Sequence, residues 1–143
     1  MRKRIYIAGP IQRGNLKHNI DQATAAFVAL AKAGFAPLCP HWSVYAKPGV
    51  WVKETWPEQR NKLMCEATAM GNEDMTHADW MGVDLPWVEC AHAVLRLPGE
   101  STGADMETAH AAGHGIPVFT SLSALVAHFA PAVTVTEDDG SSD

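Results

Sequence analysis

The chain has 143 residues, about the length of one domain, and its composition is 47% hydrophobic and 19% charged, as in ordinary globular proteins. Eleven Lys and Arg against 16 Asp and Glu give a net charge of −5. A nucleic-acid or anionic-membrane surface is therefore not expected, because either needs a basic excess. Residues 1–136 carry a net charge of only −1 and are expected to form a single domain, whereas residues 137–143 are acidic and expected to be disordered.

The start of the chain is basic and then apolar, but the apolar run ends at Gly9-Pro10, before the core of a signal peptide is complete. No apolar stretch approaches the ~18 residues of a membrane span. Cys39, Cys65 and Cys90 form no Cys-x-x-Cys pair, so they predict buried thiols rather than disulfides or a zinc ribbon. We therefore expect a cytoplasmic protein without membrane contact.

Strands and helices are expected to alternate along the chain. Short apolar runs predict strands, and apolar residues three or four apart between capping residues and glycine stops predict helices. The expected elements are a strand at 5–8, a helix from a capping box at 19–22 to Gly34, a strand at 35–39, a loop at 40–54, a helix at 55–71, a helix beginning at Asp84, a strand at 93–97, a helix at 104–112, a strand at 116–119, a helix at 121–129 and an edge strand at 133–135. This order predicts a three-layer α/β sandwich with a mainly parallel sheet of four to five strands, whose ligands bind beyond the carboxyl ends of the strands.

One loop at such a strand end leads directly into a helix, through Ser101, Thr102, Gly103 and Ala104. Free backbone N–H groups and the positive end of the helix dipole make such a junction a natural anion site. The Ser101 hydroxyl adds a donor, and Gly103 allows a ligand to approach the backbone closely. An ordinary N-cap and turn explains the same residues equally well.

Two carboxylates are placed to act near this junction. Glu107 lies in the first turns of the same helix, where the dipole is expected to keep it ionised, as a nucleophile attacking the anomeric carbon of a sugar requires. Asp84, the expected N-cap of the helix before the third predicted strand, also approaches the carboxyl edge of the sheet. Two carboxylates around one cleft are common in glycosidic cleavage. A solvated helix residue at Glu107 and a plain cap at Asp84 are the alternatives.

Other side chains give weaker signals. Glu107, His110 and His114 share one helical face, but a metal site there needs a ligand from elsewhere, so no metal is expected. His41 follows a predicted strand and could contact a ligand. The aromatic loop that begins at Trp42 could stack on a nucleobase or simply pack against the protein. The Gly-x-Ser-x-Gly elbow of Ser-His-Asp hydrolases is absent.

Four short motifs occur in a familiar order. They are Ile5-Tyr6-Ile7-Ala8-Gly9-Pro10, Asp84-Leu85-Pro86-Trp87, Ser101-x-Gly103-x-x-x-Glu107 and Gly115-Ile116-Pro117-Val118. Over residues 4–120 this order resembles the nucleoside 2'-deoxyribosyltransferase superfamily, and within it most of all the 2'-deoxynucleoside 5'-monophosphate N-glycosidases.

The resemblance implies a flavodoxin-like (Rossmann-like) fold and cleavage of the bond between a (deoxy)ribose and a nucleobase. Glu107 matches the family's nucleophile, which forms a covalent glycosyl–enzyme intermediate. Asp84 matches the aspartate that contacts the sugar and assists protonation of the departing base. The resemblance also implies a small nucleoside or nucleotide partner, a homodimer or higher homo-oligomer, and no metal or organic cofactor.

The residue at position 101 separates two branches of this superfamily. The transferases resemble Asp-x-Gly-x-x-x-Glu, whereas the monophosphate N-glycosidases carry serine, which suits phosphate because a carboxylate would repel it. In the loop after the first predicted strand the arginine is displaced by one residue from its place in the N-glycosidases. The residues expected to bind substrate are Gly9, Pro10, Ile11, Arg13, His41, Trp42, Ser101 and Gly103. A deoxyribosyltransferase and a non-catalytic nucleotide sensor are the alternatives to a monophosphate N-glycosidase.

Overall fold

The structure, a computed structural model, describes residues 1–11, 13–45 and 76–131. In chain order the elements are β1 (Arg4–Ala8), α1 (Leu16–Lys32), β2 (Ala36–Leu38), the 3-10 helix η1 (Pro40–Tyr45), α3 (His77–Glu89), β3 (Ala93–Arg96), α4 (Thr102–Gly113), β4 (Val118–Phe119) and α5 (Leu122–Phe129). No helix in these ranges is long and apolar enough to cross a membrane.

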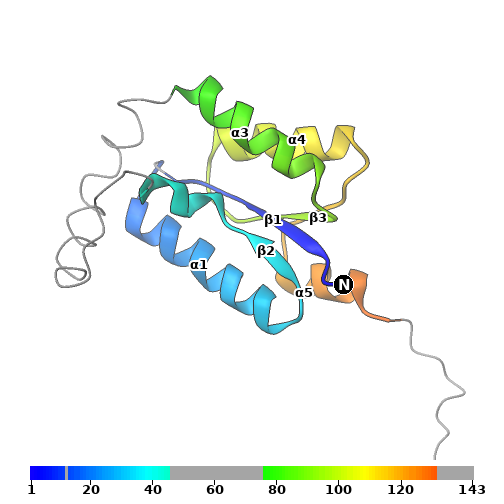
Figure 1. The fold of residues 1–143 in the computed structure, drawn as a ribbon. Helices are drawn as coiled ribbons and strands as arrows, with labels where there is room; N and C mark the ends of the chain where they lie inside the picture. The colour runs from blue at the N-terminus through cyan, green and yellow to red at the C-terminus, as the bar shows by residue number, and fades with distance from the viewer. Residues whose placement is uncertain (12, 46–75, 132–143) are drawn as a thin grey trace, which may run out of the picture.

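The four described strands form one parallel sheet in the order β2-β1-β3-β4. This is the strand order of flavodoxin-like folds, in which the order reverses beside β1. Helices α1 and α5 cover one face of the sheet, and α3 and α4 cover the other (Figure 1). The prediction of a flavodoxin-like three-layer α/β sandwich is therefore confirmed.

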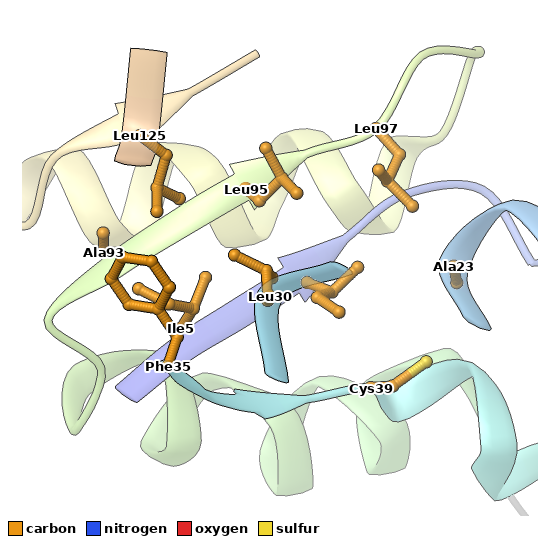
Figure 2. Packing of buried hydrophobic residues seen from close by; sticks show 10 residues of the cluster. Ile5, Ala23, Leu30, Phe35, Cys39, Ala93, Leu95, Leu97 and Leu125 are labelled. Carbon is orange, nitrogen blue, oxygen red and sulfur yellow. The ribbon is translucent and has the colours of Figure 1, made fainter. Parts of the chain in front are cut away.

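The central strand β1 is buried on both faces, as parallel strands usually are. Ile5 and Ile7 pack with Leu30 of α1 and Leu125 of α5 in the larger core cluster, which Figure 2 shows. Tyr6 and Ala8 alternate with them and face α3 and α4. A tyrosine in the middle of a buried strand thus points at the two helices that carry the predicted catalytic carboxylates.

Helix α1 begins earlier than the predicted capping box at 19–22. Asn15 is the N-cap, and its Oδ1 accepts a hydrogen bond from the His18 backbone N–H at 2.9 Å. Asn19 is instead buried within the helix, and its Nδ2 donates to the carbonyls of Ile11 and Arg13 at 3.0 and 2.8 Å. The capping prediction at Asn19 was wrong because this side chain braces the loop before the helix.

Helix α3 also begins earlier than predicted. Thr76 is its N-cap, in a capping box in which Thr76 Oγ1 accepts from the Asp79 N–H and Asp79 Oδ2 accepts from the Thr76 N–H. The prediction that Asp84 caps this helix was therefore wrong. Asp84 and Pro86 lie inside α3, where Asp84 projects from the middle of a helix rather than from its end.

The remaining elements agree with the sequence pattern with small shifts in their ends. Ser121 caps α5 as predicted, and β2 and β4 are shorter than the runs that predicted them. Cys39 is buried as expected, and burial raises the pKa of its thiol to about 11, whereas Cys90 is exposed. The predicted helix at 55–71, the edge strand at 133–135, the acidic tail at 137–143 and Cys65 lie outside the described residues.

Candidate active site

Glu107 is the central carboxylate of the candidate site. It projects from α4 toward the sheet and is only 5% exposed. Tyr6 of β1 is only 1% exposed, and its hydroxyl donates a hydrogen bond of 2.6 Å to Glu107 Oε2. A buried carboxylate that accepts from a buried hydroxyl is held in one position, which excludes the solvated alternative for Glu107.

Asp84 joins this pair from the neighbouring helix α3. Its partly buried carboxyl is close enough to hydrogen-bond with both Glu107 and Tyr6. Three elements far apart in the sequence thus place two carboxyls and one phenol together. The structure brings together the two residues that the sequence predicted as catalytic.

Burial dominates the electrostatics of this cluster. It raises the pKa of Glu107 to about 8, the Asp84 charge adds to the rise, and the Tyr6 hydrogen bond and the Arg96 charge oppose it. Burial also raises the pKa of Asp84, and it raises that of Tyr6 well above its ordinary value, so the phenol remains a donor. The expectation that the helix dipole keeps Glu107 ionised was wrong, because the effect of desolvation on its pKa outweighs that of the dipole. Two carboxyls this close titrate as a coupled pair.

Ser101 and Gly103 lie at the start of α4. Ser101 is the N-cap, and its Oγ accepts from the Ala104 backbone N–H at 3.0 Å, which leaves the hydroxyl hydrogen free to donate to a ligand. A methyl group added at Gly103 would lie 3.5 Å from Met81 Cε and 3.7 Å from His77 Cε1. The start of α4 therefore lies beside the first turns of α3, on the side of the sheet that holds the carboxylate pair.

The loop after β1 packs directly against the loop after β3. A methyl group at Gly9 would lie 2.9 Å from Leu97 Cβ, so this close approach requires glycine. Arg13 Nη2 forms an exposed ion pair of 2.9 Å with Glu100 Oε1. The two loops border an open groove of about 570 Å³, whose lining residues include Pro10 and Arg13 but neither carboxylate of the pair.

His41 is buried at the same end of the sheet. Only 1% of it is exposed, and the described residues give neither ring nitrogen a hydrogen bond of good geometry, although the Pro10 backbone lies close to the ring. Its Nε2 is 3.5 Å from the position of a methyl group at Gly9. Burial lowers the pKa of His41 to about 4, against a smaller opposing effect of the Pro10 backbone, so the ring is neutral at pH 7. A neutral imidazole has one donor and one acceptor nitrogen, and it can bind a ligand through either of them.

Trp42 packs on the opposite face from Glu107. Its Nε1 donates to Thr24 Oγ1 of α1 at 3.0 Å, and its ring lies 4.6 Å from that of Phe27. The structure therefore does not bring Trp42 together with the carboxylate pair. The rest of the aromatic loop beyond residue 45 lies outside the described residues.

The sequence interpretation missed two residues of this site, Tyr6 and Arg96. Arg96 of β3 donates to the Leu97 carbonyl and, through Nη2, to the Gly99 carbonyl and Asp105 Oδ1, both at 3.0 Å. It therefore braces the loop before α4, and its charge lowers the pKa of Glu107. The alternation of β1 carried a signal for Tyr6, because a buried phenol needs a hydrogen-bond partner on the face it points to.

Comparisons with known proteins give a low structural similarity and no match in sequence. No protein-family profile and no curated protein matches the chain. A solved structure of a 2-deoxyribosyltransferase from Bacillus psychrosaccharolyticus is similar with a TM-score of 0.45 and 15% sequence identity, over 80% of this chain and 69% of that chain.

Proposed function

We propose that this protein hydrolyses the N-glycosidic bond of (deoxy)nucleoside 5'-monophosphates to a free base and (deoxy)ribose 5-phosphate. The observation that carries the proposal is the contact of Glu107, Asp84 and Tyr6, because it supplies two adjacent carboxyls with raised pKa values and a donor that orients one of them. The nucleoside class of the substrate rests on the order of the sequence motifs.

The chemistry proceeds in two steps. The ionised Glu107 carboxylate attacks C1' of the sugar, the bond from C1' to the base nitrogen breaks, and Asp84 gives its proton to the departing base. Water then attacks C1' and Asp84 accepts its proton. The sugar phosphate leaves and the Glu107 carboxylate is restored.

This order of steps requires Asp84 to be protonated and Glu107 to be ionised when the attack begins. The Arg96 charge favours that arrangement, because it lowers the pKa of Glu107. The interaction between the two carboxyls opposes it, because it raises the pKa of Glu107 and lowers that of Asp84, so substrate binding has to move the proton to Asp84. Tyr6 acts as a positioning residue, because its hydrogen bond holds Glu107 in place and lowers the pKa of that carboxyl.

The phosphate is assigned to the start of α4. Ser101 can donate its hydroxyl hydrogen while its oxygen caps the helix, and Gly103 keeps the backbone free of a side chain. Together with the positive end of the helix dipole they bind a dianion without a net positive surface. A neutral domain with an acidic tail is compatible with such a ligand.

Base release and base exchange distinguish the possible activities. The protein is incubated with nucleosides and with nucleoside monophosphates, with and without a second base, and the products are separated by chromatography. Release from monophosphates is expected, and it should be lost in Glu107→Ala but kept in Asp21→Asn, an exposed carboxylate of α1 paired with Lys17. Exchange on unphosphorylated nucleosides would identify a transferase instead. Tight nucleotide binding without turnover would identify a sensor.

Two variants at one position test the phosphate assignment. Ser101→Asp and Ser101→Asn both retain a good helix cap, so both should fold, but only aspartate brings a negative charge. We expect Ser101→Asp to raise KM for monophosphates at least about 10-fold more than Ser101→Asn does. Equal losses in the two variants would remove Ser101 from the phosphate site.

A further inference from the structure

Three potential metal ligands lie together at the ends of α3 and α4. Glu89 Oε2 is 2.7 Å from His110 Nε2 and 4.0 Å from His114 Nε2. One donor atom from each residue lies within 4.8 Å of the others. In a tetrahedral zinc site, ligand atoms ~2.0–2.2 Å from the metal lie about 3.3 Å from one another. Small side-chain rotations therefore suffice to place all three donors around one ion.

The two histidines lie close together at the end of α4. His110 is four residues before His114, the C-cap of α4, and their rings lie 4.4 Å apart. His110 Nε2 donates to Glu89 Oε2, and it gives up this proton when it binds the ion. The His114 Nδ1–H donates to the His110 carbonyl at 2.9 Å, which leaves the lone pair of His114 Nε2 free. A metal-bound histidine typically donates a hydrogen bond from the ring nitrogen that does not bind the metal, and this bond fixes the tautomer and the orientation of the ring.

The third ligand comes from a different helix than the sequence pattern suggested. Glu107 shares a face with His110 and His114, but its carboxyl turns to Tyr6 and Asp84. Glu89, at the last residue of α3, contributes the carboxylate instead. Two imidazoles and one carboxylate form a donor set typical of zinc and other first-row transition metals.

We propose that Glu89, His110 and His114 form a binding site for a divalent transition-metal ion of the zinc class. The ion joins the C-terminal ends of α3 and α4, one helical turn beyond Glu107, and so clamps together the two helices that carry the candidate catalytic pair. The site uses no residue of that pair, so the clamp does not depend on the proposed activity.

Metal binding is tested directly on the full chain after treatment with a chelator. Titration with Zn²⁺ followed by calorimetry should give one site per chain, and Co²⁺ should give the visible absorption of a low-symmetry site with nitrogen and oxygen ligands. Saturating Zn²⁺ should raise the melting temperature by about 5 °C or more. Failure of the wild-type protein to bind either ion overturns the proposal.

Three variants test the assignment of the ligands. His114→Ala and Glu89→Gln alter side chains that are about half exposed, so both should fold, and each should weaken Zn²⁺ binding by at least about 10-fold and abolish the thermal shift. His18→Ala removes an exposed histidine of α1 and should leave both unchanged. Equal losses in His18→Ala, or unchanged binding in His114→Ala, would show adventitious surface binding and refute the site.

Discussion

Replacing Glu107 by glutamine should stabilise the protein, and the gain should depend on pH. Glu107 is buried between α4 and the sheet, where ionisation is costly, and burial raises its pKa from the ordinary 4.5 to about 8. Glutamine has nearly the same shape and can still accept the Tyr6 hydrogen bond through its amide oxygen. It cannot ionise, so the cost of a buried charge disappears.

The sign follows from proton linkage. A carboxyl whose folded-state pKa is raised contributes its full stability below the unfolded pKa of 4.5, and that contribution is lost as the pH rises through about 8. The wild-type free energy of unfolding should therefore fall relative to that of Glu107→Gln by up to ~1.4 kcal/mol per pH unit in this window. Above pH 8 the accumulated difference should be on the order of 5 kcal/mol.

The measurement is urea denaturation of both proteins at intervals between pH 4.5 and 9. Glu100→Gln is the matched control, because Glu100 is an exposed carboxylate and its removal should change stability by a pH-independent amount of about 0–1 kcal/mol. If the difference between wild type and Glu107→Gln stays constant over this range, the assignment of a buried, proton-binding Glu107 is refuted.

Four further substitutions probe the site and the structure around it. Tyr6→Phe removes the donor to Glu107 and so raises the pKa of that carboxyl. Base release at pH 7 should fall about 10- to 100-fold, and the acidic limb of the pH–rate profile should move to higher pH. A pH–rate profile that does not move would contradict this role of Tyr6. His41→Leu removes two buried nitrogens that have no well-formed hydrogen bond to a described residue, and it should raise the free energy of unfolding in urea by ~1–3 kcal/mol. A loss of stability would show that the ring has partners. Gly9→Ala should lower the free energy of unfolding by about 1–3 kcal/mol, because its methyl group meets Leu97. Gly82→Ala, whose methyl group meets no described atom within 4 Å, should raise the free energy of unfolding by ~0.5–1 kcal/mol. Equal melting temperatures for the two variants would contradict the close approach at Gly9.

The fold class was predictable because its signals are local. Apolar runs mark β1 and β3, and serine caps at Ser101 and Ser121 mark the starts of α4 and α5. The errors at α1 and α3 have a common physical cause. Asn, Thr and Asp can cap a helix, brace a loop or project from its middle, and neighbouring residues compete for these roles through tertiary contacts that a sequence pattern does not contain.

The two carboxylates of the candidate site could be predicted from the sequence, but their raised pKa values could not. Glu107 and Asp84 were identified from a short motif and a resemblance, and the structure places them in contact. Their raised pKa values come from the surrounding β1, α3 and α4, whose packing removes water from both carboxyls. Tyr6 is about 100 residues from Glu107 in the sequence, and Arg96 is 11 residues from it. Only the folded chain brings the Tyr6 hydroxyl to 2.6 Å from Glu107 Oε2 and the Arg96 charge close enough to lower the pKa of Glu107.

The sequence by itself determined that strands and helices alternate, that residues 1–136 are nearly neutral and the last residues acidic, and that two carboxylates are catalytic candidates. These features are readable because hydrophobic periodicity, composition and capping chemistry act over a few residues. The tertiary structure decided which groups meet: Glu107 turns to Tyr6 and Asp84, and Glu89 rather than Glu107 joins His110 and His114. Side chains on one helical face can point to different neighbours, and the packing of α3 against α4 selects among them. Burial, pKa and ligand geometry follow from that packing and not from spacing along the chain.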